Sequence, residues 1–438
     1  MKNTFAMISL GCAKNLVNSE QMLYLMSEAG YELTPDPEGA DLVIINTCGF
    51  IDSAKSEAID NILEMAELKK AGRLKGIIVT GCLAQRYQDS ILEELPEIDA
   101  VLGVGSFSEI VQAADAVMRK AAYRSFASKN APVDEIPRVV STGPSWAYLR
   151  IAEGCDNCCA FCAIPQIRGR YRSRPMEAVV EEARELASHG VKELIVIAQD
   201  ITRYGTDLYK QRSLATLCRK LSEIDGIEWI RLHYLYPDQF DEELIGEIAS
   251  NDKIVKYLDI PIQHINNGIL KSMNRRGTGE DIRKLFAYLR ERIPSLVLRT
   301  SLITGLPGEG EAEFEELCAF LREAKIERAG VFPFSPEEGT PAARMPHADA
   351  EEAQRRAELI MDLQGVIMDD FCNGMIGKVL RVLCLEADEE TGLLSGRSYA
   401  DSPDIDGCVL FEGSCPEGEF TDVLITGAED GILYGEEA

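Results

Sequence analysis

The segment EGCDNCCAFCAIPQIRGRYRSR, residues 153–174, is the most constraining feature of the sequence. It contains Cys155, Cys159 and Cys162 with the spacing C-x3-C-x2-C. Three thiolates on one loop can bind three irons of a cubane 4Fe–4S cluster, whereas a complete set of protein ligands requires four cysteines. The fourth iron is then open to an external ligand. The spacing therefore predicts a cluster that takes part in chemistry rather than one that only stores an electron.

Two other interpretations of this loop are open. One is a structural zinc knuckle, which requires a fourth Cys or His nearby, and the other is a group of buried free thiols. Cys158 also lies in the segment and could replace Cys159 as a ligand. The resulting C-x2-C-x3-C is a less familiar spacing, so we interpret Cys158 as a bystander.

Three further cysteines follow predicted strands in residues 1–122. Short apolar runs alternate there with helical stretches, which is the pattern of a parallel sheet covered by helices. Cys12, Cys48 and Cys82 come shortly after the strands predicted at residues 5–10, 42–46 and 76–80. Since parallel strands end at one edge of a sheet, the three cysteines should converge. They predict a second three-thiolate iron–sulfur site, although Cys is also a common small core residue.

Together the two groups of cysteines resemble the methylthiotransferase branch of the radical S-adenosylmethionine (SAM) enzymes, over essentially the whole chain. Phe161, directly before Cys162, matches the aromatic residue of the radical SAM signature. The resemblance implies two 4Fe–4S clusters, a catalytic one on Cys155, Cys159 and Cys162, and one that carries or supplies sulfur on Cys12, Cys48 and Cys82. It also implies that one SAM yields a 5′-deoxyadenosyl radical, which abstracts a hydrogen atom, and that another SAM supplies the methyl group.

Residues 146–370 contain about six βα units, with strands predicted at residues 147–151, 193–198, 229–234, 257–260, 296–303 and 328–334. They resemble the open, partial TIM-like barrel of radical SAM enzymes, which place their chemistry at the carboxyl ends of the strands. Several of these ends are polar or glycine-rich. The resemblance implies that they contact SAM, through Gln199, Asp200, Gln263, Gly305 and Gly308.

Other polar groups follow the cluster loop or line the barrel. A basic run contains Arg168, Arg170, Arg172 and Arg174. At alternating positions these side chains could share one face of an extended segment and hold the SAM carboxylate or an acidic substrate side chain. Alternatively, they pair with carboxylates of the chain. We interpret His233 and His264 as hydrogen-bonding groups of the barrel rather than proton-transfer groups.

Residues 371–438 predict a small all-β domain. Five β-like runs alternate with turns that contain Gly and Asp, which indicates a five-stranded barrel. The segment resembles the TRAM domain with which methylthiotransferases bind substrate. It carries fifteen Asp and Glu residues against Lys378, Arg381 and Arg397. This balance argues against RNA and favours a basic protein partner.

The predicted fold is therefore α/β with three domains. Residues 1–122 form a Rossmann-like α/β domain that carries the second cluster, and residues 123–145 form a linker. Residues 146–370 form the radical SAM core, and residues 371–438 form the TRAM domain.

The composition indicates the compartment and the kind of partner. The 438 residues include 13 cysteines and carry a formal net charge of −28. With no export signal and no apolar run of membrane-spanning length, the cysteines favour metal binding over disulfides, and we predict a cytoplasmic protein. The negative charge argues against direct binding of nucleic acid and favours a basic partner such as a ribosomal protein.

Several motifs resemble the ribosomal branch of the methylthiotransferases: SLGCAKNLVNSE, TGCLAQRY, AQDITRYG, YLDIPIQH and FSPEEGTPA. This resemblance implies methylthiolation of the β-carbon of an aspartate in the small-subunit ribosomal protein S-twelve. It also implies a reductant such as flavodoxin or ferredoxin, and a sulfur donor. The alternatives are a tRNA adenosine methylthiotransferase with the same fold, and an electron carrier or iron–sulfur scaffold, which would form no 5′-deoxyadenosine.

Overall fold

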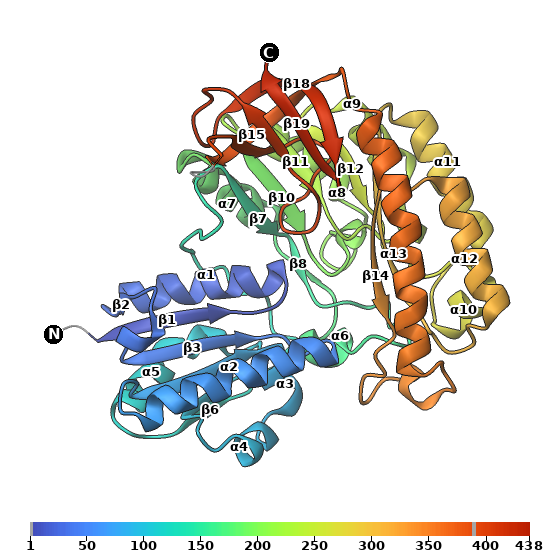
Figure 1. Cartoon of the computed structure of the whole chain (residues 1–438). Helices are drawn as coiled ribbons and strands as arrows, with labels where there is room; N and C mark the ends of the chain where they lie inside the picture. The colour runs from blue at the N-terminus through green and yellow to red at the C-terminus, as the bar shows by residue number, and fades with distance from the viewer. Residues whose placement is uncertain (1–2, 388–390) are drawn as a thin grey trace. The chain divides into compact units, whose positions relative to one another are not determined.

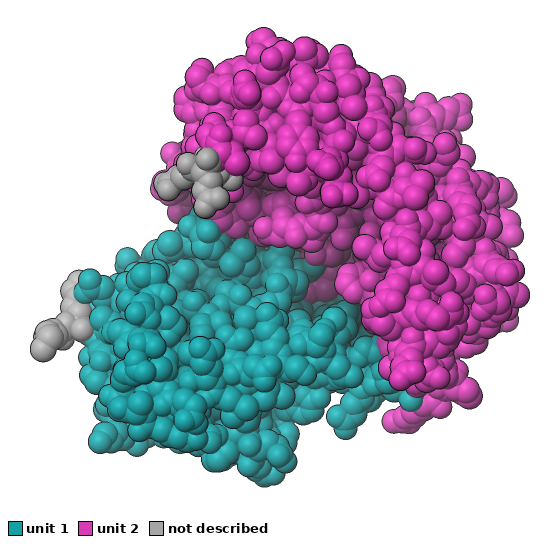
Figure 2. Space-filling view, in the orientation of Figure 1, with its two compact units in different colours: residues 1–141, 150–178, 335–343 teal, residues 142–149, 179–334, 344–438 magenta. Residues whose placement is uncertain are grey.

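The computed structural model of the chain describes residues 3–387 and 391–438 (Figure 1). Asp388, Glu389 and Glu390, three of the acidic residues counted in the TRAM segment, lie outside the described residues. The chain divides into two compact units, which Figure 2 shows in different colours. Unit 1 contains residues 1–141, 150–178 and 335–343, and unit 2 contains residues 142–149, 179–334 and 344–438.

Unit 1 is built on a parallel six-stranded sheet with the order β2-β1-β3-β4-β5-β6. The strands are β1 (Thr4–Ser9), β2 (Glu32–Leu33), β3 (Leu42–Thr47), β4 (Gly76–Gly81), β5 (Ala100–Leu102) and β6 (Tyr123–Ser125). The helices are α1 (Ala13–Glu28), α2 (Asp52–Lys70), α3 (Cys82–Tyr87), α4 (Ser90–Glu94) and α5 (Ile110–Met118). Strand β6 lies within the predicted linker and extends the sheet past residue 122.

The central strand β3 is buried along its whole length, which explains its nearly continuous apolar sequence. Successive side chains of a strand point to opposite faces. Val43 therefore joins a core cluster that contains Ile62 of α2, whereas Ile44 joins a cluster that contains Met26 of α1. Helices thus cover both faces of the sheet, as the predicted Rossmann-like domain requires.

The cluster segment also belongs to unit 1. It contains strand β8 (Ala152–Glu153), helix α6 (Ile164–Arg168) and strand β9 (Arg172–Ser173). The two strands pair antiparallel, with Glu153 opposite Arg172. The third segment of the unit, residues 335–343, follows strand β14 and precedes helix α13 in the sequence.

Unit 2 contains an open six-stranded sheet with the order β14-β13-β12-β11-β10-β7. Its strands are β7 (Trp146–Arg150), β10 (Glu193–Ile197), β11 (Trp229–Leu232), β12 (Ile254–Asp259), β13 (Val297–Thr304) and β14 (Arg328–Pro333). Its helices are α7 (Met176–Ser188), α8 (Leu214–Ser222), α9 (Glu242–Ser250), α10 (Asn267–Ser272), α11 (Gly279–Arg292), α12 (Glu311–Ala324) and α13 (Ala350–Asn373). The predicted open barrel of βα units is confirmed.

Helix α13 packs along β14 and leads into a closed barrel with the strand order β15-β16-β17-β19-β18 (Figure 1). Its strands are β15 (Val379–Ala387), β16 (Leu394–Arg397), β17 (Val409–Glu412), β18 (Phe420–Glu429) and β19 (Ile432–Glu437). The predicted five-stranded C-terminal barrel is confirmed. In the described part of the chain, no helix combines the length and the apolar character needed to cross a membrane.

The loop between β16 and β17 is fixed to the open sheet by buried polar contacts. Arg231 Nη1 donates to the carbonyl of Tyr399, at 2.8 Å. Arg328 pairs with Asp401, also at 2.8 Å, and both side chains are buried. The hydroxyl of Tyr257 donates to Asp406 at 2.6 Å. Carboxylates of the small barrel therefore help to anchor it to the larger domain.

Candidate iron–sulfur and SAM site

The loops that follow β1, β3 and β4 carry Cys12, Cys48 and Cys82. Cys12 directly precedes α1 and is exposed, Cys48 is half-buried, and Cys82 is buried as the first residue of α3. A Cβ atom on Gly11 would lie 2.8 Å from the Cβ of Cys48 and 3.3 Å from its Sγ. A Cβ on Gly49 would lie 2.8 Å from the α3 backbone. The loop of Cys12 therefore lies against the loop of Cys48, and the loop of Cys48 lies against the start of α3 at Cys82.

Helix α3 also contacts the segment that carries the other cysteines. Cys82 packs in one buried cluster with Ala163 and Ile167, which follow Cys162 in the sequence. Arg168, at the end of α6, is fully buried and donates from Nη1 to Glu153 at 2.8 Å. Unit 1 thus holds both cysteine groups, with a buried guanidinium close to the N-terminal one.

The three N-terminal thiols differ in their electrostatic surroundings. Desolvation disfavours the thiolate of Cys12 even though the residue is exposed, but the charges of Lys14 and Arg168 outweigh this and lower the pKa of Cys12. Burial raises the pKa of Cys48 to about 11, and the neighbouring Cys82 adds to the increase. Burial also raises the pKa of Cys82, although Arg168 opposes this. Metal binding to Cys48 and Cys82 would therefore release protons.

The loop that carries Cys155, Cys159 and Cys162 is held by backbone contacts. The Cys155 N–H donates to Gly169 at 3.1 Å, and the Cys162 N–H donates to Cys159 at 3.0 Å. Gly154 has φ = +77°, and a Cβ there would lie 2.1 Å from the carbonyl oxygen of Arg170. Only glycine fits at this approach.

Cys158 differs from its three neighbours. It is exposed, whereas Cys155, Cys159 and Cys162 are half-buried. It also has φ = +52°, in the left-handed region that L-residues rarely adopt. Its interpretation as a bystander stays a prediction.

A single metal ion would need its ligands much closer together than a cubane does, because each thiolate of a cubane binds a different iron. Among residues 3–387 and 391–438, no group of three or more His, Cys, Asp or Glu side chains is arranged to hold one metal ion.

The basic run after the cluster loop does not form the predicted shared face. Arg168 is a buried helix residue, Arg170 is exposed in the next turn, and Arg174 is buried. The alternative prediction, pairing with carboxylates, is correct for two of them. Arg168 pairs with Glu153, and the Nε of Arg174 lies 2.9 Å from Oε2 of Glu135. The helical turn that ends at Arg168 breaks the alternation expected of an extended segment.

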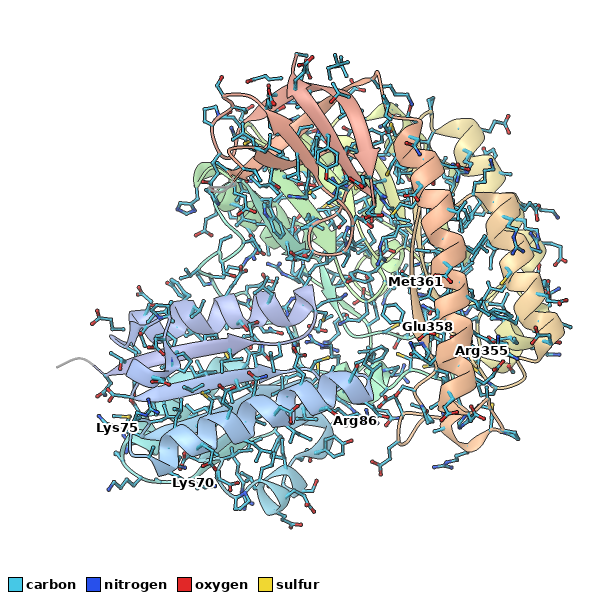
Figure 3. The ribbon with its side chains drawn as sticks, viewed as in Figure 1. Lys70, Lys75, Arg86, Arg355, Glu358 and Met361 are labelled. Atoms are coloured by element: carbon cyan, nitrogen blue, oxygen red, sulfur yellow. The ribbon has the colours of Figure 1, made fainter. Side chains whose placement is uncertain are left out.

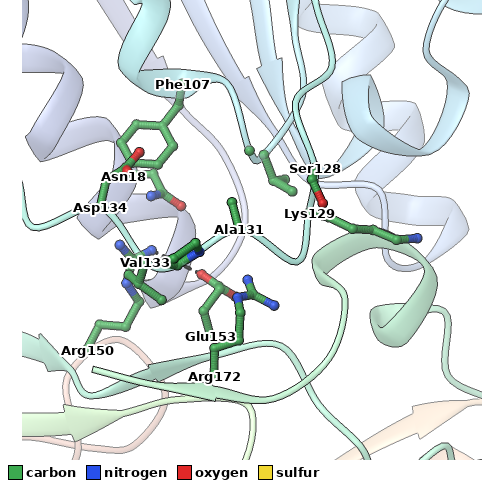
Figure 4. A pocket seen from close by; sticks show the side chains of 13 residues that line it. Asn18, Phe107, Ser128, Lys129, Ala131, Val133, Asp134, Arg150, Glu153 and Arg172 are labelled. Atoms are coloured by element: carbon green, nitrogen blue, oxygen red, sulfur yellow. Dashed lines mark hydrogen bonds and ion pairs between the residues drawn. The ribbon is translucent and has the colours of Figure 1, made fainter. Parts of the chain in front are cut away.

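A small pocket lies beside these charges, with Asn18, Arg150, Glu153 and Arg172 among its lining residues (Figure 4). Its volume is about 70 Å³. Sites for small molecules usually measure roughly 300–1,000 Å³, so this pocket is too small for SAM.

The residues predicted to contact SAM lie in unit 2, near the carboxyl ends of strands. Gln199 and Asp200 follow β10, and Asp200 is buried. The Asp200 carboxylate accepts from the Thr202 N–H at 3.0 Å and pairs with Arg203 at 3.1 Å. Asp200 therefore stabilises the helical turn that follows it, Ile201–Arg203. Contact of either residue with SAM stays a prediction.

Gln263 and Gly305 both have positive φ, of +69° and +75°. The backbone of Gln263 bonds to Ser301 and Ile303, at 2.9 Å each, and so continues the pairing with β13. The Gly305 N–H donates to Glu309 at 2.8 Å. The turn that contains Gly305 and Gly308 is thereby closed on itself, next to the end of β13.

The two histidines make hydrogen bonds, as expected. His233 Nε2 lies 2.9 Å from the Ser402 hydroxyl. His264 is fully buried, and its Nδ1 accepts from the Asn266 N–H at 3.0 Å. Its Nε2 lies 3.3 Å from Glu309, a carboxylate to which the sequence interpretation gave no role.

Two further residues with no predicted role hold the N-terminal cysteine loops. Asn15 contacts all three loops, and Glu337 contacts α3 from residues 335–343. Both lie within motifs singled out above, SLGCAKN and FSPEEGTPA. The role of Asn15 could have been predicted from its position one helical turn after Cys12, which brings its side chain close to the cysteine loops.

Known families match three parts of the chain. Residues 4–103 match the uncharacterized protein family UPF0004, residues 149–321 match the radical SAM superfamily, and residues 376–437 match the TRAM domain. The first match falls in unit 1 and the third in unit 2, whereas the radical SAM match includes the cluster segment of unit 1 and the open sheet of unit 2.

Curated relatives match the whole chain. The ribosomal protein uS12 methylthiotransferase RimO of Acetivibrio thermocellus is 48% identical and covers 100% of this chain and 98% of its own. The protein of the same name from Lachnoclostridium phytofermentans is 48% identical and covers 98% of each chain. That from Thermoanaerobacter sp. is 47% identical and covers 100% of each.

Solved structures share the fold. The radical SAM methyltransferase TsrM from Kitasatospora setae, with cobalamin and a [4Fe-4S] cluster bound, superposes with a TM-score of 0.56. It covers 87% of this chain and 81% of that one at 14% identity. The cobalamin-dependent radical SAM enzyme OxsB has a TM-score of 0.52 at 13% identity, over 84% of this chain and 56% of that one.

The match to the radical SAM superfamily means that the chain works with SAM and an iron–sulfur cluster. The full-length relatives mean that it is an enzyme that transfers a sulfur-containing group. The chain belongs to the RimO family of radical SAM methylthiotransferases.

Proposed function

We propose that this enzyme methylthiolates the β-carbon of an aspartate in ribosomal protein uS12, the S-twelve protein of the small subunit. One SAM would provide the 5′-deoxyadenosyl radical, and another would provide the methyl group. The observation that carries the proposal is 48% identity, over the full chain, to proteins named ribosomal protein uS12 methylthiotransferase.

The proposed ligand sets are Cys155, Cys159 and Cys162 for the catalytic cluster and Cys12, Cys48 and Cys82 for the second cluster. Bound there, the two clusters would supply reductive cleavage of SAM and a site for sulfur. The residues present fit such groups, since each set offers three thiols on closely held loops. The proposed SAM contacts are Gln199, Asp200, Gln263, Gly305 and Gly308.

The protein's own contribution would be to hold and shield these groups. The guanidinium of Arg168 places a buried positive charge near Cys12 and Cys82, where three thiolates would concentrate negative charge. The Arg168 guanidinium is held by the Glu153 carboxylate, which accepts a hydrogen bond from Nη1 at 2.8 Å. Arg168 would thus offset part of the cost of burying thiolates.

The small C-terminal barrel supports a basic protein as substrate. Two of its acidic residues, Asp401 and Asp406, have buried side chains. One of its three cations, Arg397, is also buried, and lies 2.8 Å from Glu193. Within the described part of this barrel, its exposed cations are Lys378 and Arg381, against at least nine exposed carboxylates. Such a surface repels phosphates and attracts lysine-rich or arginine-rich protein.

We propose the domains that the sequence predicts, at 1–122, 146–370 and 371–438, joined by a linker at 123–145 whose residues Tyr123–Ser125 add strand β6 to the N-terminal sheet. The further partners would be a reductant such as flavodoxin or ferredoxin and a sulfur donor. The proposed compartment is the cytoplasm, where ribosomal proteins are available as substrates.

The substrate is tested in the host organism. The gene is deleted, and the intact masses of small-subunit proteins are compared with those of the parent strain, together with the modified nucleosides of bulk tRNA. We expect uS12 alone to lose a methylthio-sized mass while the tRNA is unchanged. Loss of a methylthio-adenosine instead would favour the tRNA enzyme.

The two clusters are tested by iron content. Two 4Fe–4S clusters give about eight irons per reconstituted chain. Replacement of either cysteine set by Ala should leave about four irons, because each cubane contains four. A wild-type value of about four would remove the second cluster from the proposal.

A further inference from the structure

Asn15 lies in α1, three residues after Cys12, and is only 1% exposed. Its Nδ2 group donates to the backbone carbonyl of Leu10 at 3.0 Å and to that of Thr47 at 2.9 Å. Leu10 precedes Cys12 by two residues, and Thr47 directly precedes Cys48. One carboxamide therefore ties the end of β1 to the end of β3.

The other side of the same carboxamide faces the third cysteine. The Cys82 thiol donates to Asn15 Oδ1, with 3.6 Å between sulfur and oxygen. Arg168 Nη2 donates to the same oxygen. Asn15 thus contacts all three N-terminal cysteine loops, and through Arg168 it also contacts the segment that carries the other cysteine set.

These partners fix the orientation of the carboxamide. An Asn side chain has two N–H donors on its nitrogen and an acceptor oxygen. The NH2 group and the oxygen have nearly the same shape, so only their hydrogen-bond partners distinguish the two orientations of the carboxamide. Rotation by 180° would turn Oδ1 toward the carbonyls of Leu10 and Thr47 and the NH2 group toward Arg168. Acceptors would then face acceptors and donors would face donors, so one orientation alone satisfies every neighbour.

The backbone of Asn15 is fixed as well. Its N–H donates to the carbonyl of Cys12 at 2.8 Å, and its carbonyl accepts from Asn46 Nδ2 at 2.8 Å. The same Nδ2 group donates to the Ser19 hydroxyl at 2.9 Å. Because its backbone is held by Cys12 and by Asn46 of β3, the Asn15 side chain can hold the cysteine loops at fixed positions relative to the sheet.

We infer that Asn15 is a positioning residue for the second iron–sulfur site, and that it sets the spacing of the Cys12, Cys48 and Cys82 loops. The inference rests on the proposed second cluster. A cubane binds its thiolates only at fixed spacing, and residues that hold metal ligands typically change metal affinity 10–100-fold when they are replaced. Replacement of Asn15 should therefore affect the second cluster and leave the catalytic cluster unchanged.

The test uses the full chain with Cys155, Cys159 and Cys162 replaced by Ala, so that only the N-terminal set can hold iron. Into this background are placed Asn15→Ala and Asn15→Asp. The second variant keeps the side-chain volume and an acceptor for Arg168 but removes both N–H donors. The matched control is Asn18→Ala, because Asn18 is a buried residue of the same helix that donates to Gln21 at 3.3 Å.

The readouts are the electron paramagnetic resonance spectrum of the reduced cluster and the rate at which a chelator removes its iron. Both Asn15 variants should change the spectrum and lose iron about tenfold faster or more. The Asn18→Ala chain should behave as the parent does. Circular dichroism and thermal unfolding identify any variant that fails to fold, and Asn15→Asp keeps the test valid if Asn15→Ala does not fold.

The outcomes distinguish failure of the positioning role of Asn15 from failure of the proposed second cluster. A parent chain that binds no cluster overturns the proposed second site itself. A parent chain with about four irons, alongside Asn15 variants with the same spectrum and the same rate of loss, overturns the positioning role. Equal changes in the Asn15 and Asn18 variants would also overturn it, because the effect would then belong to helix α1 as a whole.

Discussion

The carboxylate of Glu337 accepts a hydrogen bond from Arg86, with 2.6 Å between Oε2 and Nη1. Arg86 is labelled in Figure 3 and lies on α3, which begins at Cys82. The same Nη1 donates to the carbonyl of Gly49, directly after Cys48, at 2.9 Å. Residues 335–343 thus help to hold two of the N-terminal cysteine loops.

The first prediction concerns Glu337→Gln. The Glu337 side chain is 2% exposed and also pairs with Lys55 at 3.0 Å. Removal of the carboxylate would leave the mostly buried Arg86 without its carboxylate partner, whereas Lys55 keeps Asp52 at 2.5 Å. We therefore expect a loss of about 3 kcal/mol in the free energy of unfolding. The measurement is urea unfolding followed by circular dichroism.

Glu338→Gln is the control for this variant, because the Glu338 side chain is exposed and only its backbone carbonyl accepts from Arg86. It should leave the urea midpoint unchanged. Equal midpoints for the two variants would show that the buried carboxylate does not stabilise the fold.

The second prediction concerns Gly154→Ala. A Cβ at this position would meet the carbonyl oxygen of Arg170 at 2.1 Å and must displace the loop that carries Cys155. We expect the catalytic cluster to be lost, with about four irons remaining and no 5′-deoxyadenosine formed from SAM. Iron analysis and chromatography of the SAM products measure both.

Gly143→Ala is the control for Gly154→Ala, because it introduces the strain of positive φ without the steric overlap. Gly143 also has positive φ, at +92°, but among the described residues other than its chain neighbours no heavy atom lies within 4 Å of the position that its Cβ would take. Its replacement should cost about 1–2 kcal/mol from the left-handed conformation alone and retain full iron. A Gly154→Ala chain with full iron would disprove the close-approach explanation.

The third prediction concerns Cys158. Replacement of this exposed residue by Ala should leave the iron content and the cleavage of SAM unchanged, whereas Cys159→Ala should abolish cleavage. Cys158→Gly should additionally stabilise the loop by about 1 kcal/mol, because glycine adopts positive φ without strain. Loss of iron on replacing Cys158 would reassign it as a ligand.

The fourth prediction concerns the pH dependence of stability in unit 2. Burial alone would raise the pKa of Glu193, but the charges of Arg397 and Arg231 outweigh it and hold the pKa below the ordinary 4.5. A carboxyl whose pKa is lower in the folded state stabilises above its unfolded pKa, and the stabilisation is lost as pH falls through the folded value.

Wild type should therefore exceed Glu193→Gln in stability at pH 7, and the difference should shrink as the pH falls below about 4.5. Thermal unfolding across this range is the measurement. Glu228→Gln is the control, because Glu228 pairs with Arg381 at the surface, where such pairs contribute little. A difference that is independent of pH would exclude Glu193 as the titrating group.

The sequence predicted those features that depend on local patterns. Apolar runs and turn residues identified the strands of the open sheet, the five-stranded barrel, and β1, β3 and β4 of the first sheet, because each of these strands buries a short continuous segment. Two short edge strands were missed: β2, which is exposed at both residues, and β6, which lies within the predicted linker. The convergence of the loops after β1, β3 and β4 followed from parallel pairing, which the structure confirms.

The contacts that hold the site were not predictable in the same way. Glu337 and Arg86 are 251 positions apart, and no local pattern links them. Asp401 and Asp406 were counted only among the acidic residues of the C-terminal domain, whereas in the structure they lie close to Arg328 and Arg299 of the open sheet. Of the two possibilities considered for the basic run, the shared face does not form, because a helical turn ends at Arg168.

Unit 1 is assembled from three separated stretches of the chain, and this has a consequence for its biosynthesis. Domains generally fold in order as they leave the ribosome. The loops of Cys12, Cys48 and Cys82 lack their contacts with Arg168 until residues 150–178 leave the ribosome. They lack their contacts with Glu337 until residues 335–343 do so. Loading of iron at the amino-terminal end would therefore be a late event of synthesis, completed only after most of the polypeptide has been translated.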